Sequence, residues 1–193
     1  IRIIKALFFF PFVINLVVVG LVFSWFYNPS YGLLSEILAW AGMEPIPLLA
    51  DEDLVTYSII FAGMWPQVAY CMILYLAGLA SLKPELIEAA RIDGAKGWKM
   101  LIWVVLPQLK PASFIAIVVS VVNALRSFDL IAIMTAGGPW GSSTVLAYEM
   151  YEQSLFNYRM GYGAAIATVL FLIMDVYIVW FLRRLYRNEK GFD

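Results

Sequence analysis

The residues best suited to chemistry are gathered in one polar stretch, residues 85–107, which reads ELIEAARIDGAKGWKMLIWVVLP. Its first fifteen residues mix both signs of charge in Glu85, Glu88, Arg91, Asp93, Lys96 and Lys99. The stretches on both sides are apolar enough to span a bilayer, where each charge would cost several kcal/mol. We therefore expect a polar helix–turn–helix at a membrane face, held by a partner in water.

Several chemistries are excluded by residues that the sequence lacks. There is no histidine, and the single cysteine, Cys71, lies in an apolar run, so a histidine-based metal site or triad and a disulfide framework are ruled out. There is no Gly-rich Walker loop, so the chain does not bind ATP by that route. No acid–base constellation indicates catalysis, and we interpret Cys71 as a packing residue.

A second set of polar residues falls inside apolar stretches. Ser113, Ser120, Asn123 and Ser127 are spaced by seven, three and four residues, so one continuous helix would place them on one stripe. Two interpretations stay open. The stripe either hydrogen-bonds to a neighbouring helix or lines a polar path for a hydroxyl-rich solute.

Two further pairs lie in predicted spans. Gln67 and Tyr70 share a helix face and combine hydrogen-bonding and aromatic groups, which suits a sugar ring, although Tyr70 could simply pack. Arg126 and Asp129 are three residues apart and can pair, either as a structural lock or at an outer gate. Asp175 lies in another apolar stretch without an obvious partner.

The composition defines the elements that must position these residues. Hydrophobic residues make up 63% of the chain and charged residues 14%, whereas soluble domains are nearer half and a quarter. The fold class is therefore all-α, a polytopic helical membrane protein. Hydropathy predicts four spans, at 3–26, 54–79, 111–135 and 162–182, with a kink at Pro11 in the first. Short helices are expected at 33–41, at the membrane interface, and at 145–156.

Basic residues predict the orientation. With residues 81–110 placed inside, eleven of the thirteen Lys and Arg residues fall on the cytoplasmic side, and both ends of the chain are cytoplasmic. The loop at 28–53 carries five acidic residues and no basic residue. The chain opens on Ile1 rather than Met, so we expect further sequence before it.

The polar stretch also carries a spaced pattern: E-A-A, three residues, G, nine residues, an aliphatic residue, any residue, L-P. It is met by Glu88-Ala89-Ala90, Gly94, Val104, Leu106 and Pro107. This pattern, placed between two spans on the basic side, resembles the EAA loop of the inner-membrane subunits of ATP-binding-cassette (ABC) importers. The wider match resembles the sugar (oligosaccharide) branch and covers essentially the whole chain.

The resemblance implies a MetI-like ABC importer transmembrane domain over residues 1–193, with a coupling loop at 81–110 and two or more spans preceding Ile1. It implies a permease in a bacterial or archaeal cell membrane, not an enzyme, with ATP-Mg held by separate ATPase subunits. Further implied partners are a second permease subunit, as a heterodimer, and an extracytoplasmic solute-binding protein. The implied ATPase-coupling residues are Glu88, Ala89, Ala90, Asp93, Gly94, Leu106 and Pro107. The implied substrate path contains Gln67, Tyr70, Ser120, Asn123 and Ser127, with Arg126 and Asp129 as the candidate gate pair.

Three alternatives remain. Glycerol-3-phosphate or its diesters would want a cation in the path, and Arg126 is the only one away from the ends of a predicted span, since Lys5 marks the cytoplasmic end of the first span. An ion-coupled secondary carrier would need intramembrane carboxylates, for which Asp129 and Asp175 are candidates. A scaffold without transport is disfavoured, because it needs no polar stripe.

Overall fold

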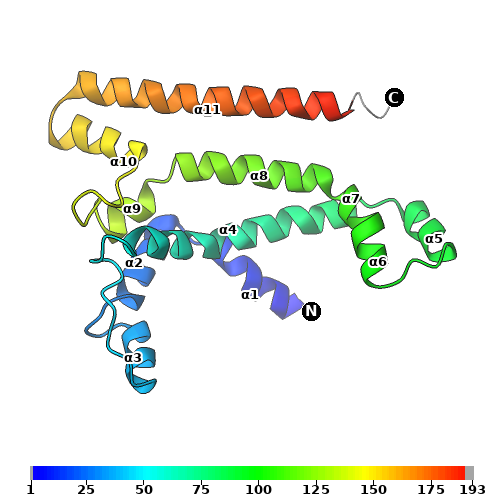
Figure 1. Cartoon of the computed structure of the whole chain (residues 1–193), viewed down its shortest axis with the longest axis horizontal. Helices are drawn as coiled ribbons and strands as arrows, with labels where there is room; N and C mark the ends of the chain where they lie inside the picture. Colours follow the sequence, from blue (N-terminus) through cyan, green and yellow to red (C-terminus); the bar gives the residue numbers. More distant parts are fainter. Residues whose placement is uncertain (1, 190–193) are drawn as a thin grey trace. The chain divides into compact units, whose positions relative to one another are not determined.

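The computed structural model describes residues 2–189, and over these residues the chain is helical, with no strand (Figure 1). Its contacts divide it into two units, which are described separately: residues 2–12 with 66–121, and residues 13–65 with 122–189. The helices are α1 Arg2–Val13, α2 Leu16–Phe26, α3 Leu33–Trp40, α4 Val55–Ala80, α5 Pro84–Ile92, α6 Trp98–Met100, the π-helix η1 Leu101–Val105, α7 Leu106–Gln108, α8 Lys110–Leu125, α9 Asp129–Met134, α10 Leu146–Tyr151, the π-helix η2 Glu152–Phe156 and α11 Met160–Glu189.

Two helices confirm the second and fourth predicted spans. Helix α4 has 26 residues and runs through Pro66 without a break. Residues 160–184 of α11 form an apolar helix of 25 residues. At about 1.5 Å per residue, each is longer than the roughly 30 Å of a hydrocarbon core. The short helices expected at 33–41 and 145–156 are also present, as α3 and as α10 with η2.

The first predicted span, 3–26, is not one helix. The chain leaves helical geometry at Ile14 and Asn15, and the Asn15 side chain caps α2 by accepting a hydrogen bond from the Val17 N–H at 2.8 Å. Asn competes for local backbone donors and so favours helix starts over helix interiors. The interruption is therefore due to Asn15. Pro11, where a kink was predicted, lies within α1.

The third predicted span, 111–135, is also wrong as a single helix. Helix α8 ends at Leu125, and α9 begins at Asp129, whose carboxylate suits the exposed amides of a first turn. Between them, Phe128 packs its ring against Tyr151, with centroids 4.9 Å apart. Within residues 2–189, two helices can cross a membrane alone, and a bent pair, 98–108 with 110–125, adds a third. Four unbroken spans are therefore not observed.

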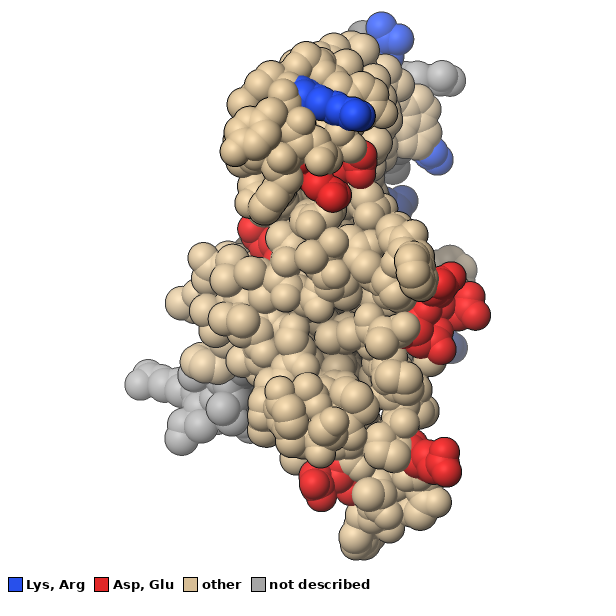
Figure 2. Space-filling view, turned by 90° about the vertical axis from the view of Figure 1, so that its left-hand side faces the viewer, with Lys and Arg blue, Asp and Glu red and all other residues tan. Residues whose placement is uncertain are grey.

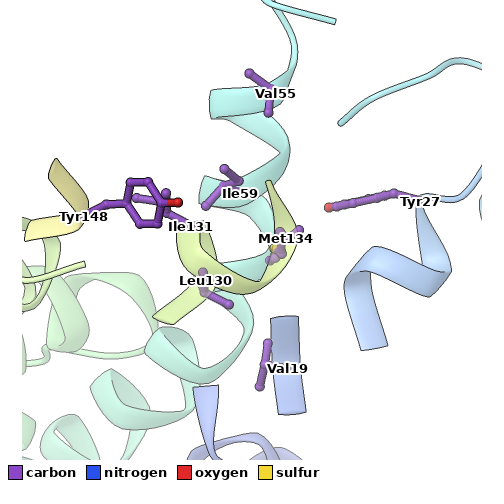
Figure 3. Packing of buried hydrophobic residues seen from close by; sticks show 9 residues of the cluster. Val19, Tyr27, Val55, Ile59, Leu130, Ile131, Met134 and Tyr148 are labelled. Carbon is purple, nitrogen blue, oxygen red and sulfur yellow. The ribbon is translucent and has the colours of Figure 1, made fainter. Parts of the chain in front are cut away.

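The second unit holds the buried core, built from α2, the first half of α4, α9 and α10 (Figure 3). Its members Val19 and Val55 are completely buried. Small residues allow close approach, since a Cβ added at Gly20 would lie 3.2 Å from Ile133 and one at Gly63 would lie 3.2 Å from Leu130. This packing fixes the short helix α9 against α2 and α4.

The core is closed by Tyr27, which follows α2 and donates its hydroxyl to the Ser58 carbonyl at 3.2 Å. Burial raises the pKa of Tyr27 to about 12, so this hydroxyl stays protonated and able to donate even at alkaline pH. In the same unit, α10 and η2 fold back along the start of α11 (Figure 1). There Gly163 faces Ser154 so closely that an added Cβ would collide with the serine hydroxyl.

Candidate functional site

The polar stretch of the first unit contains a short helix with a sharply defined end. Pro84 occupies the first turn of α5, where its missing N–H costs nothing, and Glu85 lies beside the exposed amides. At the other end, Ala95 N–H donates to Ala90 O at 2.9 Å and Gly94 N–H donates to Arg91 O at 3.1 Å. These two bonds form a Schellman motif, with Gly94 at φ +82°. The turn predicted at Gly94 is therefore confirmed.

Sequence reasoning missed a second glycine in this turn. Gly97 precedes α6 with φ +54° and ψ −123°, a conformation essentially limited to glycine. A Cβ at Gly94 or at Gly97 would meet nothing within 4 Å, so backbone conformation rather than crowding requires glycine at both positions. The G-A-K-G spacing of residues 94–97 was the signal that could have revealed the second.

The return segment is not a regular helix. Pro107 has no N–H to offer to the preceding turn, and Leu106 N–H donates to Leu101 O, five residues back, in the π-helix η1. The Gln108 side chain donates to Val104 O at 3.2 Å. The chain then bends by 64° between residues 98–108 and 110–125. Two prolines four residues apart, Pro107 and Pro111, account for this bend, because each removes a helical hydrogen bond.

Helix α4 touches the bend directly at Gly78. A Cβ added there would lie 2.9 Å from Leu109 Cδ2 and 3.0 Å from Ala112 Cβ. Leu109 is buried and lies between α7 and α8. Gly78, which the sequence analysis did not single out, therefore sets how closely α4 approaches Leu109, the residue that joins α7 to α8.

The predicted coupling residues lie on the surface of this unit. Glu88, Ala89, Asp93, Gly94, Leu106 and Pro107 are exposed, and Ala90 is half-buried. Helix α5 itself buries none of its residues in the unit, although it packs against α6 and η1. The structure thus brings the motif together on one compact helix–turn–helix with a free outer surface.

Two predicted path residues of the first unit, Gln67 and Ser120, are joined by a hydrogen bond. Gln67 Nε2 on α4 donates to Ser120 Oγ on α8 at 2.6 Å, and Ser120 Oγ donates to Ala116 O at 2.7 Å. Gln67 also approaches Cys71 Sγ at 3.7 Å. This arrangement is the interhelical hydrogen bonding that was one of the two interpretations of the serine stripe.

Tyr70, one turn further along α4, uses its ring rather than its hydroxyl. The ring stacks on Phe12 with centroids 5.9 Å apart and an interplanar angle of 26°. The side chain is half-buried, and its hydroxyl has no hydrogen bond to any of residues 2–189. Tyr70 therefore combines a packed ring with a phenol group that is available to a ligand.

The remaining path and gate residues belong to the second unit. Asn123 is exposed on α8 and makes no side-chain hydrogen bond within the described residues. Ser127 lies in the break between α8 and α9, so the stripe that begins at Ser113 ends at Asn123. The same break separates exposed Arg126 from half-buried Asp129, and no ion pair joins these two described side chains. Their role as a gate stays a prediction.

A family model places the chain among known proteins. Residues 1–188 match the binding-protein-dependent transport system inner membrane component, and the chain belongs to this family. It is therefore a multi-pass membrane protein. This finding confirms the family that the EAA pattern indicated.

Individual relatives agree with this assignment. A probable ABC transporter permease of Pyrococcus horikoshii is 36% identical over 188 residues, covering 96% of this chain and 64% of its own length. The trehalose/maltose transport system permease protein MalF of Thermococcus litoralis is 32% identical over 94% of this chain and 61% of its own length. The sn-glycerol-3-phosphate transport system permease protein UgpA of Agrobacterium fabrum is 32% identical over 88% of this chain and 58% of its own length.

The fold matches a solved structure. A chain of a bacterial ABC transporter involved in the import of the acidic polysaccharide alginate superposes with a TM-score of 0.87 and 23% identity, covering 96% of this chain and 65% of that chain. The expected all-α, MetI-like fold is thereby confirmed. The chain spans less than two thirds of the length of these relatives.

Proposed function

We propose that this chain forms part of the permease subunit of an ABC importer that carries a sugar or oligosaccharide. The observation that carries the proposal is the exposed helix α5, which presents Glu88-Ala89-Ala90 and ends in a fixed turn at Gly94. Two small residues beside a carboxylate let this helix lie close to a protein surface. The segment returns to α8 through hydrogen-bonded helix with no flexible linker.

In this proposal, the chain is not an enzyme. Separate cytoplasmic subunits hold ATP-Mg and hydrolyse it, and a cleft in one of them receives α5. A second, different permease subunit completes the path, and an extracytoplasmic binding protein delivers the solute. ATP binding and hydrolysis then bias a membrane assembly that alternates between two states. Residues 81–110 and both chain ends face the cytoplasm, as the positive-inside rule predicts from the charge distribution of the sequence.

Sugar is the favoured cargo, because relatives are named for trehalose/maltose and for sulfoquinovosyl glycerol transport. The phenol of Tyr70 and the free amide of Asn123 supply hydrogen-bonding groups of the kind that a neutral polyol needs. One observation favours a phosphate-bearing cargo instead. Arg126 is exposed and forms no ion pair with Asp129 among the described side chains, and a relative is named for sn-glycerol-3-phosphate transport.

Glu88→Lys tests the proposed coupling. It should reduce both copurification of the ATPase subunit and substrate-stimulated ATP hydrolysis in reconstituted vesicles, because attraction at a docked surface becomes repulsion. Glu52→Lys makes the same charge change at another exposed position and should leave both readouts unchanged. Normal ATPase recovery and normal uptake with Glu88→Lys would remove α5 from the coupling role.

A further inference from the structure

Helix α3 carries an apolar stripe that faces away from the protein. Leu33, Ile37 and Trp40 are exposed by 48%, 52% and 93%. At about 100° per residue, the three side chains fall within an arc of roughly 60°. The opposite face of α3 packs into the second unit, where Ser35 is buried and Leu34 contacts the core. The stripe is therefore a distinct second apolar face, not the edge of the buried one.

The helix is held firmly at both ends. At its start, Gly32 N–H donates to Asn28 O at 2.8 Å, and a Cβ on Gly32 would lie 2.6 Å from Phe26 O and 2.7 Å from Trp25 O. At its end, Gly42 N–H donates to Ala39 O and Met43 N–H donates to Leu38 O, which is a Schellman motif. The tight turn at Gly32 therefore sets how α3 leaves α2, and the Schellman motif defines where α3 ends.

Helix α2 carries an exposed apolar face of its own. Val18, Leu21, Val22 and Trp25 lie on one face of α2, at spacings of three and four residues, and all four are exposed. Tyr31, also exposed, lies between the two helices along the chain. In a family of inner membrane components, an exposed apolar helix face lies against lipid or against another membrane helix. Helix α3 presents a residue, Trp40, of a type that prefers the membrane–water interface.

We propose that α3 lies in the membrane–water interface, with Leu33, Ile37 and Trp40 inserted at the headgroup–acyl boundary. This inference goes beyond the transport function and does not depend on the identity of the cargo. The carboxylate of Glu36 lies at the border of the stripe and is exposed. A protein partner covering the stripe would bury that charge beside it, whereas a lipid interface leaves it among headgroups and water.

The charge of the surrounding segment defines the kind of lipid contact. Residues 28–53 contain no Lys or Arg. The face turned to the viewer in Figure 2 is mainly uncharged, with separate acidic groups and with basic groups in its upper part and at its right-hand edge. Attraction to anionic lipid is therefore not available here. The contact is hydrophobic and interfacial, so it should be formed equally well in zwitterionic lipid and should not weaken as salt is raised.

Spin labels test the proposal on the complete transporter in phosphatidylcholine nanodiscs. Cysteines at positions 37 and 40, introduced singly with Cys71→Ser, should give labels that are accessible to oxygen and protected from a water-soluble nickel chelate. A label at position 36 should show the reverse. Protection of positions 37 and 40 from both reagents would mean that protein covers the stripe, and nickel access at both would mean that water does. Either result overturns the proposal.

A matched pair of tryptophans provides a second measurement that leaves the stripe largely intact. Trp40 and Trp140 are both 93% exposed, but Trp140 lies in the loop after α9, next to Gly141 and Ser142. Brominated phosphatidylcholine should quench the intrinsic fluorescence of Trp140→Phe as strongly as that of the parent protein. It should quench the fluorescence of Trp40→Phe less. Equal quenching in the parent protein and Trp40→Phe contradicts the proposal.

Discussion

Gln67 Nε2 donates a hydrogen bond to Ser120 Oγ at 2.6 Å, which joins α4 to α8 within the first unit. The serine hydroxyl accepts this bond and at the same time donates to Ala116 O, one turn back on its own helix, at 2.7 Å. Both members are half-buried, so the pair can hold the two helices together and still lie at the edge of a path. Interhelical bonds of this kind contribute about 0.6 kcal/mol on average and up to about 1.7 kcal/mol.

This pair should behave as a coupled unit. Gln67→Leu and Ser120→Ala should each lower the midpoint of unfolding in detergent, and the double variant should be no worse than the more damaging single variant. Ser113→Ala is the control, because the Ser113 hydroxyl makes no hydrogen bond within residues 2–189. Additive losses in the double variant would show that the bond does not couple these helices.

Asn123 should act differently, because its side chain is exposed and makes no hydrogen bond within the described residues. Asn123→Leu should weaken solute uptake while leaving the unfolding midpoint unchanged. A lost polar contact to a bound solute is worth ~1–3 kcal/mol, so the concentration for half-maximal uptake should rise by about 5-fold to 150-fold. Ile117→Leu, at another exposed position of α8, is the control. Unchanged uptake in Asn123→Leu would remove this residue from the path.

Tyr70 allows packing to be separated from binding. Tyr70→Phe keeps the ring that stacks on Phe12 and removes only the hydroxyl. Uptake should fall while thermal stability is retained, whereas Tyr70→Ala should lower both. If Tyr70→Phe transports as well as the parent protein, the residue only packs, which was the alternative interpretation of its sequence position.

Hydropathy predicted α4 and α11 correctly, because each is long and uniformly apolar. It missed the breaks at 14–15 and 126–128, where no proline marks the interruption. Asn15 capping α2 and Phe128 packing on Tyr151 decide these breaks. The second of these is a tertiary contact that no local pattern encodes. The Gln67–Ser120 bond likewise depends on how two helices lie against each other, so sequence identified both residues but not their pairing.

The turn between α5 and α6 should depend on backbone conformation alone. Gly97→Ala introduces a Cβ that meets no atom within 4 Å but must adopt φ +54°. Strain of this kind costs on the order of 1–3 kcal/mol, so substrate-stimulated ATP hydrolysis should fall while membrane insertion is retained. Gly161→Ala is a close control, since its added Cβ also meets nothing within 4 Å and its φ is not positive. Equal activity in the two variants would exclude a requirement for glycine at position 97.

Gly78 should control the coupling between α4 and the bend at Leu109. An alanine at position 78 would place its Cβ 2.9 Å from Leu109 Cδ2 and 3.0 Å from Ala112 Cβ, so the two helices must separate by a few tenths of an ångström. The leucine end is flexible, but the Ala112 Cβ is fixed to the backbone of α8. Because this contact lies where the polar stretch enters α8, we expect Gly78→Ala to lower the amount of solute transported per ATP hydrolysed, with little effect on subunit abundance.

The contact partner supplies the control for this prediction. Leu109→Ala removes the nearer of the two obstructing atoms, so Gly78→Ala combined with Leu109→Ala should recover part of the lost transport. Leu109→Ala alone creates a cavity at a buried position and should lower stability by about 2–5 kcal/mol. The recovery is therefore measured as transport per ATP in assembled, purified transporter rather than as total uptake. A double variant that is less well coupled than Gly78→Ala would show that the two residues do not act through their contact.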